Sequence, residues 1–175
     1  IIIEMTKISK NNEVQWAHCD LREIIEDVLS LMRNQINFLD IEILNKVARP
    51  ILIKCDPIQV EQIVLNIINN AVHALQGNLV NRVVSISARK SRKIIFLDIW
   101  NNGPPIPKNY QSKIMSPFFT TKGVGKGTGL GLAVSYGIVQ AHGGKLSFYS
   151  SEERGTCFRL LFPVPEELPE VSTQT

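Results

Sequence analysis

The sequence has few cysteines, little excess charge and no long apolar run. Its three cysteines, at positions 19, 55 and 157, are too few and too widely spaced for a disulfide framework or a zinc site, and they favour a reducing compartment. A net charge of +3 is far below that of a nucleic-acid-binding surface. Because no apolar stretch is long enough to span a bilayer, we expect a cytoplasmic segment without direct membrane contact.

The length and composition fit one compact domain. The 175 residues, of which 44% are apolar, are enough for a substantial single core. The chain starts at Ile1 without an initiator methionine, so we expect a segment of a longer protein, which can itself be anchored in the inner membrane. We predict a connector over residues 1–19, a domain over 20–164, and a polar, proline-containing, disordered tail over 165–175.

Three segments are predicted to be helices, two from start signals and apolar spacing and the third from its stop at Gly143-Gly144, and six shorter segments have the pattern of strands. The predicted helices cover residues 21–36, 57–75 and about 129–142, and the predicted strands cover 41–47, 51–55, 83–89, 93–100, 145–150 and 156–163. Helices and hairpins in separate runs predict an α+β fold with helices on one face of a sheet. The long Gly- and Pro-rich stretch at about 102–127 is expected to be a lid with at most one short helix.

The predicted helix 57–75 has short amides beside its apolar face. The predicted apolar face consists of Ile58, Leu65, Ile68, Val72 and Leu75, and the polar stripe of Gln59, Gln62, Asn66, Asn70 and His73. Asparagine is unfavourable inside a helix because its side chain competes for the backbone. Two asparagines one turn apart therefore favour a binding site, although this pattern alone leaves a solvated surface as an alternative.

Residues 123–131, GVGKGTGLG, hold five of the eleven glycines and lead into a predicted helix. Backbone N–H groups without side chains can approach phosphate oxygens, and a helix N-terminus favours an anion. Lys126 and Thr128 add a charge and a hydroxyl. The segment is not a Walker loop, because Leu132 follows its last glycine. The alternative, a flexible linker, fits poorly with Leu130 and Leu132 inside and beside it.

Polar residues also follow the predicted strand 93–100. The segment 101–107, NNGPPIP, leads from the strand end into the predicted lid. An amide at a strand end is well placed to bind the edge of a base. Seen alone, however, this segment is better explained as a proline-stiffened turn.

Four of these segments in order resemble the conserved boxes of one family. Residues 62–75 (QIVLNIINNAVHAL), 101–107 (NNGPPIP), 115–122 (MSPFFTTK) and 125–133 (GKGTGLGLA) resemble the N box, first glycine box, F box and second glycine box of the catalytic ATP-binding domain of sensor histidine kinases. This domain belongs to the GHKL superfamily, together with DNA gyrase, ninety-kilodalton heat-shock chaperones and mismatch-repair ATPases. The resemblance covers about residues 21–163. It implies the Bergerat fold, a two-layer α/β sandwich with a mixed sheet and a flexible ATP lid.

The resemblance also implies roles for individual residues. Asn70 matches the Mg²⁺ ligand, Asn66 the supporting amide one turn earlier, and Lys126 a charge on the phosphates, so these three are the expected catalytic residues. His73 matches a phosphate-contacting position, with a neutral surface histidine as the alternative. The implied ATP-binding set is Asn66, Asn70, His73, Ala74, Asn101, Gly103, Ile106, Phe119, Thr120, Thr121, Lys122, Gly125, Lys126, Gly127, Thr128, Gly129, Leu130, Gly131, Leu132 and Thr156.

The implied activity is transfer of the ATP γ-phosphate to a histidine of a separate helical domain, followed by relay to a response-regulator aspartate. Gyrase-like relatives have a glutamate at the position of Asn66, and an amide cannot act as that general base. None of His18, His73 and His142 is in the setting of a phosphoacceptor. The acceptor domain, a homodimeric helical stem, is therefore expected upstream, with residues 1–19 as its connector.

Two positions depart from the family pattern. Asn101 replaces the aspartate that binds the adenine amino group, and Pro105 replaces a glycine. Asp98 cannot substitute, because three residues along a strand it faces the other side. Loss of the charge-assisted bond is expected to weaken ATP binding by about 1 kcal/mol, or to relax the preference for adenine over guanine. The alternatives to a histidine kinase are a degenerate nucleotide-binding regulatory module and a serine-directed kinase of the same superfamily.

Overall fold

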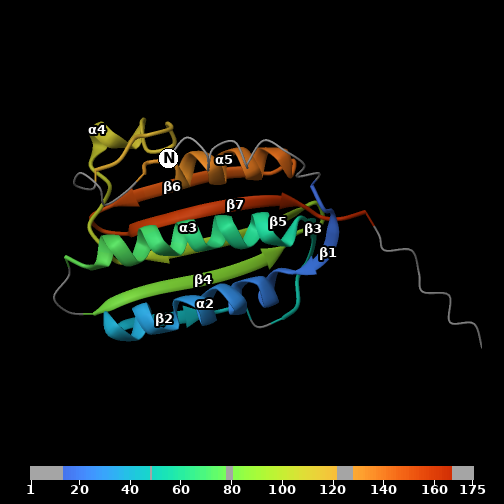
Figure 1. Cartoon of the computed structure of the whole chain (residues 1–175), viewed down its shortest axis with the longest axis horizontal. Coiled ribbons are helices and arrows are strands. Elements are labelled where there is room, and N and C mark those ends of the chain that lie inside the picture. The colour runs from blue at the N-terminus through green and yellow to red at the C-terminus, as the bar shows by residue number, and fades with distance from the viewer. Residues whose placement is uncertain (1–13, 48, 78–80, 122–127, 167–175) are drawn as a thin grey trace, which may run out of the picture.

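The computed structural model describes residues 14–47, 49–77, 81–121 and 128–166. Within these ranges, strands and helices follow one another in two layers (Figure 1). The elements are β1 (Ala17–Asp20), α2 (Leu21–Phe38), β2 (Ile41–Asn45), β3 (Leu52–Cys55), α3 (Pro57–Leu75), β4 (Arg82–Lys90), β5 (Ile94–Asn101), α4 (Lys108–Gln111), α5 (Gly131–Ala141), β6 (Lys145–Ser151) and β7 (Gly155–Pro163).

The main sheet has the strand order β2-β4-β5-β7-β6. The β2–β4 pair is parallel and the other pairs are antiparallel, so the sheet is mixed, as the family resemblance implied. Helices α2, α3 and α5 lie side by side across one face of the sheet, with α3 in the middle (Figure 1). The predicted α+β fold with helices on one face is therefore confirmed.

Helix α3 is the central element of the core. Its N-terminus is capped by Asp56, whose Oδ1 accepts a hydrogen bond from the Gln59 backbone N–H at 3.3 Å, and Pro57 occupies the first helical position. Its buried stripe runs from Val60 to Leu75 and packs between the sheet and the flanking helices. The prediction that Ile58 belongs to this face is wrong. Ile58 is 73% exposed, because it lies on the side of α3 that faces away from the core.

Strand β1 is an element that the sequence did not predict. It pairs antiparallel with β3, with Ala17 opposite Cys55 and Asp20 opposite Leu52. At its end Asp20 caps α2 by accepting a hydrogen bond from the Arg22 backbone N–H at 2.9 Å. The expected connector, residues 1–19, therefore ends in a strand that packs as part of the domain.

The segment before β1 is fastened to the ends of two helices. The Gln15 backbone N–H donates to Asp56 Oδ2 at 3.1 Å, and the Trp16 ring lies 4.9 Å from the ring of His142. His142 follows α5 and is only 4% exposed. Its Nε2 accepts a hydrogen bond from the Asp56 backbone N–H at 3.0 Å, so Nδ1 carries the proton and donates to the Ile138 carbonyl at 2.8 Å. We call Gln15, Trp16, Asp56 and His142 the entry joint.

Helix α5 starts later than the sequence predicts. Gly129 has a φ of +67°, in the left-handed region, so the helix begins at Gly131 instead of Gly129. A Cβ atom at Gly129 would lie 2.5 Å from the backbone carbon of Phe118. Phe118 itself has a positive φ of +64°, which is uncommon for a residue with a side chain. Gly129 is therefore required both by its own backbone and by the close approach of the 115–121 segment.

The structure can be compared with the predictions on membrane-spanning segments and on cysteines. Among the described residues, no helix combines the length and the apolar character needed to cross a membrane. Cys19, Cys55 and Cys157 are free thiols. Burial raises the pKa of Cys55 and of Cys157, and the nearby thiol of Cys19 raises the pKa of Cys55 further.

These buried thiols predict a loss of stability in alkali. An unfolded chain releases thiol protons at about pH 8.5, whereas the folded chain holds them to higher pH. The stabilising contribution is therefore complete below that pH and is lost as the pH rises above it. We expect the free energy of unfolding, measured by urea denaturation between pH 7 and pH 10, to fall as the pH rises above about 9, with about 1.4 kcal/mol per pH unit as the upper bound for each thiol. Cys55→Ala should remove part of this slope, and an unchanged slope contradicts the assignment.

Candidate functional site

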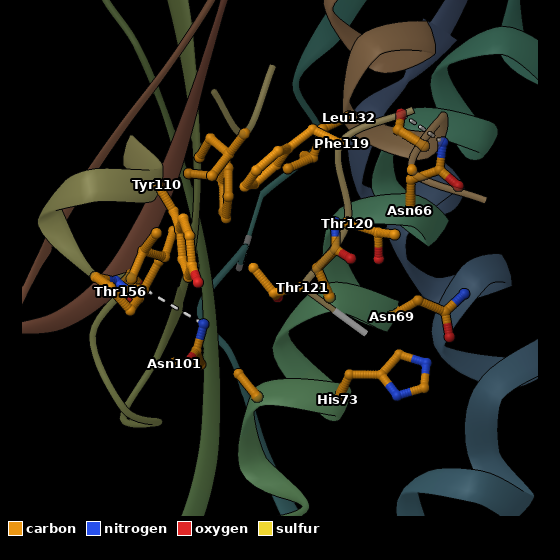
Figure 2. Close-up of a pocket in the computed structure, with 18 of the residues that line it drawn as sticks. Asn66, Asn69, His73, Asn101, Tyr110, Phe119, Thr120, Thr121, Leu132 and Thr156 are labelled. Atoms are coloured by element: carbon orange, nitrogen blue, oxygen red, sulfur yellow. Dashed lines mark hydrogen bonds between the residues drawn. The ribbon is translucent and has the colours of Figure 1, made fainter. Parts of the chain in front are cut away.

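A cavity of about 610 Å³ opens between α3, the ends of β5 and β7, the 104–121 segment and the start of α5. Figure 2 shows side chains from these elements pointing into one space. The cavity is lined by Asn66, Asn69, Asn70, His73, Ala74, Asn101, Pro104, Pro105, Ile106, Pro107, Tyr110, Ile114, Phe119, Thr120, Thr121, Thr128, Gly129, Gly131, Leu132, Thr156 and Phe158.

One wall of the cavity is a row of amides on α3. Asn66, Asn69, Asn70 and His73 are spaced i, i+3, i+4 and i+7, so they share one face of the helix. Asn69 was not among the predicted site residues, although its i+3 spacing from Asn66 is the signal that identifies it. Gln62, which we grouped with these residues, is exposed and does not line the cavity.

Asn66 connects α3 to α5. Its Nδ2 donates to the Gly131 carbonyl and to the hydroxyl of the fully buried Ser135, both at 3.2 Å. A backbone carbonyl can only accept a hydrogen bond, so the amide nitrogen must face α5. The first turn of α5 is thereby held against the amide wall, and a Cβ atom at Gly131 would be in ordinary van der Waals contact with Asn66 Cγ at 3.5 Å.

A charge-neutral amide at position 66 is predicted to be required for this connection. Asn66→Asp places a carboxylate oxygen against the Gly131 carbonyl, and we expect a loss of about 1–3 kcal/mol in the free energy of unfolding, measured by urea denaturation without nucleotide. Asn69→Asp is the matched control. It adds the same charge to the same helix and cavity, and no hydrogen bond joins Asn69 to α5 among the described residues. Equal losses in the two variants contradict a specific role for Asn66.

Asn70 has the chemistry of a magnesium ligand. Its side chain lines the cavity and makes no hydrogen bond to another described residue, which leaves Oδ1 available. The described residues contain no group of three or more His, Cys, Asp or Glu side chains suited to a metal ion. An oxygen donor from one side chain nevertheless fits Mg²⁺, since this ion keeps several waters and takes its other ligands from substrate phosphates. The residues present therefore fit a metal that arrives with a polyphosphate.

His73 lies at the open edge of the amide wall. It is exposed, and its Nδ1 lies 3.4 Å from Gln76 Oε1. Because that oxygen can only accept, Nδ1 is the donor and Nε2 remains for a ligand or for water. This position fits either alternative left open by the sequence, a phosphate contact or a surface histidine.

The opposite end of the cavity is more apolar and contains one buried amide. Asn101, at the end of β5, is only 3% exposed. Its Oδ1 accepts a hydrogen bond from the Gly103 backbone N–H at 3.0 Å, and its Nδ2 lies 3.5 Å from the Thr156 carbonyl (Figure 2). Asp98 is on the other face of β5, where Arg159 binds both of its carboxylate oxygens at 2.7 Å. The prediction that Asp98 faces away from Asn101 is confirmed.

Apolar side chains from the lid segment complete this end. Tyr110 and Phe119 pack with ring centroids 5.6 Å apart, and Ile106 and Leu132 lie beside them on the cavity wall. The Ile106 backbone N–H donates to Ser150 Oγ at 2.8 Å, and the hydroxyls of Ser150 and Thr156 are 2.6 Å apart. This pair of hydroxyls ties the lid segment to β6 and β7. A flat apolar ring with a polar edge fits this half of the cavity.

The start of α5 contributes a third kind of surface. Leu130 is the N-terminal cap residue and makes no side-chain cap hydrogen bond, while its backbone N–H donates to Thr128 Oγ1 at 3.3 Å. The first turn of a helix carries unpaired N–H groups and a positive dipole end. Because Gly131 lines the cavity, this end of α5 is close enough to favour an anion there.

The structure brings most of the predicted ligand set to one cavity. The described members that line it are Asn66, Asn70, His73, Ala74, Asn101, Ile106, Phe119, Thr120, Thr121, Thr128, Gly129, Gly131, Leu132 and Thr156. Gly103 and Leu130 do not line it. Gly103 instead holds Asn101, and Leu130 caps α5. Lys122, Gly125, Lys126 and Gly127 lie outside the described residues.

The chain matches a family model described as "Histidine kinase-, DNA gyrase B-, and HSP90-like ATPase" over residues 55–166. It is 32% identical to the sensor histidine kinase ZraS of Escherichia coli (strain K12), with 94% of this chain and 34% of that protein aligned. It is 29% identical to sporulation kinase E of Bacillus subtilis (strain 168), with 97% of this chain and 23% of that protein aligned. The chain therefore spans about a third or less of the length of these curated relatives.

Solved structures agree with the sequence comparison. The catalytic domain of the histidine kinase ThkA superimposes with a TM-score of 0.75 at 30% identity, covering 86% of this chain and 98% of that domain. A structure of ThkA in complex with the response regulator TrrA gives a TM-score of 0.76 at 26% identity, covering 94% of this chain and 46% of the kinase. The cavity between α3, the lid segment and α5, together with these matches, shows that the chain belongs to the histidine kinase-, DNA gyrase B- and HSP90-like ATPases, as a catalytic ATP-binding domain of the sensor histidine kinase type.

Proposed function

We propose that this domain binds Mg·ATP in the described cavity and transfers the γ-phosphate to a histidine supplied by another domain of its parent protein. The two halves of the cavity match the two chemical parts of ATP, its base and its phosphates. The apolar half beside Asn101 suits the base, and the amide wall with the N-terminus of α5 suits the phosphates. ATP is the substrate class that membership of this kinase-domain family implies.

The observation that supports transfer over hydrolysis is the absence of carboxylates from the described cavity wall. None of the described residues that line the cavity is Asp or Glu, and Asn66 uses its amide nitrogen to hold α5. An amide cannot take a proton from an attacking water. The cavity thus supplies positioning and charge stabilisation, and it leaves the nucleophile to a partner.

Different residues are proposed to contribute separately to the binding of Mg·ATP. Asn70 would hold Mg²⁺, which when bound neutralises charge on the phosphate oxygens. Asn66 keeps the N-terminus of α5 against the amide wall. Lys126 and the glycines at 125, 127, 129 and 131 are proposed to contact the phosphates, as the family resemblance implies. The domain would work on the cytoplasmic side of its parent protein, where ATP is available.

The proposed partners follow from the same reading. The phosphoacceptor is expected on an upstream helical domain that dimerises in the full-length protein, joined through residues 1–19. The final acceptor is a response regulator, and the ThkA–TrrA complex shows that the relative ThkA binds such a protein. The relatives include the sensor histidine kinase ZraS and the histidine kinase ThkA, so the serine-kinase and degenerate-module alternatives gain no support.

The test is phosphate transfer from ATP that carries a radioactive γ-phosphate. We expect the domain, incubated with this Mg·ATP and the purified upstream helical domain of its parent protein, to produce phosphohistidine, which is labile in acid and stable in base. ATP binding without transfer favours the regulatory module. Acid-stable phosphoserine on a partner favours the serine kinase.

A further inference from the structure

Two polar side chains of the described cavity wall are almost fully buried. They are Asn101 and Thr156, and each is 3% exposed. Asn101 lies at the apolar end, where a base would place its polar edge. A buried hydrogen-bonding group discriminates between ligands strongly, because a mismatched ligand leaves that group unpaired. The donor and acceptor pattern of Asn101 therefore sets which bases the cavity accepts.

The orientation of this amide is fixed by two backbone groups. The Gly103 N–H can only donate, so it requires Oδ1, and it holds that atom at 3.0 Å. The Thr156 carbonyl can only accept, so it requires Nδ2, which lies 3.5 Å away (Figure 2). Rotating the amide by half a turn would set donor against donor and acceptor against acceptor. Gly103 is also closely packed, since a Cβ atom there would lie 2.9 Å from Asn101 Oδ1 and 3.2 Å from Ala74 Cβ.

The fixed amide offers both kinds of hydrogen bond to a ligand. Nδ2 has a second N–H besides the one facing Thr156, and Oδ1 has a second lone pair besides the one used by Gly103. A 6-aminopurine presents a donor at C6 and an acceptor at N1. A 6-oxopurine presents an acceptor at C6 and a donor at N1. The amide can form a bond with either pattern.

We infer that Asn101 makes the cavity accept 6-oxopurine triphosphates as well as ATP. This inference rests on the proposed function and adds the identity of the base to it. The same surroundings disfavour a carboxylate at this position. The substitution Asn101→Asp would put an oxygen where Nδ2 now faces the Thr156 carbonyl at 3.5 Å, and the ionised side chain would have no donor for a 6-oxo group.

The test compares ATP with inosine triphosphate, which differs from ATP only at C6 and N1. Both dissociation constants are measured by calorimetry with Mg²⁺. For the unmodified domain we expect the two constants to agree within roughly tenfold. For Asn101→Asp we expect inosine triphosphate to weaken relative to ATP by at least roughly tenfold. Gln62→Glu adds a charge on an exposed side chain of α3 that does not line the cavity, and it should leave the ratio of the two constants unchanged.

Failure of the base inference is distinct from failure of the proposed function. If neither nucleotide binds the unmodified domain, the proposed function is wrong and this inference falls with it. If ATP binds and inosine triphosphate binds more than about tenfold more weakly, the proposed function stands and the inference is wrong. The ratio in the unmodified domain decides between these results even if Asn101→Asp does not fold.

Discussion

Replacing Asn70 by alanine is expected to lower phosphate transfer by on the order of 10²–10³-fold, with the fold intact. The side chain lines the cavity and is not engaged by another described residue, so its removal breaks no internal hydrogen bond among the described residues. It does remove the oxygen proposed to hold Mg²⁺ against the phosphates. The measurement is the rate of histidine phosphorylation at saturating Mg·ATP, together with calorimetry of ATP in the presence and absence of Mg²⁺.

The Mg²⁺ dependence identifies the cause of the loss. The unmodified domain should bind ATP more tightly with Mg²⁺ than without it, and Asn70→Ala should reduce this difference. Gln62→Ala is the matched control, because Gln62 is an exposed amide on the same helix that does not line the cavity. It should leave both transfer and Mg²⁺ dependence unchanged. Equal effects of the two substitutions, or full transfer by Asn70→Ala, would remove Asn70 from the proposed site.

The parts of the site that could be predicted are those set by local spacing. Asp56, Pro57 and Gly77 bound a helix by capping and chain-breaking chemistry, and a helix places Asn66 and Asn70 on one face whatever surrounds it. The alternation of the 83–89 and 93–100 segments likewise predicts the β4–β5 hairpin. Asn69 was missed even though the same spacing rule includes it.

The parts that could not be predicted depend on contacts between distant residues. Strand β1 has four residues and little alternation, and it forms because β3 lies beside it. The orientation of the Asn66 amide is set by hydrogen bonds to Gly131 and Ser135, which lie more than sixty residues further along the sequence. The bond from Gly103 to Asn101 is local, but it forms only because the loop turns back at the end of β5. Patterns in the sequence therefore identify the amides, whereas tertiary contacts decide which atoms they present.

The entry joint is such a tertiary feature, and it joins the N-terminus of α3 to the C-terminus of α5. His142 is its centre: it receives the Asp56 backbone N–H, donates to the Ile138 carbonyl, and packs against Trp16 and Phe162 at centroid distances of 4.9 and 6.4 Å. The two helices that it connects carry the amide wall and the anion-favouring turn. The joint thus holds in register the two surfaces proposed to bind the phosphates.

His142→Ala is accordingly expected to cost about 3 kcal/mol in the free energy of unfolding, because it leaves a cavity and an unpaired Asp56 backbone N–H, while the Ile138 carbonyl keeps its hydrogen bond from the backbone N–H of residue 142. His142→Phe keeps a ring in contact with Trp16 but provides no acceptor for the Asp56 N–H, so we expect a smaller loss of about 2 kcal/mol. Urea denaturation followed by tryptophan fluorescence measures both. His73→Ala, at an exposed histidine, should change stability by less than about 0.5 kcal/mol. Should His142→Ala and His73→Ala cost the same, the joint contributes nothing beyond ordinary surface packing.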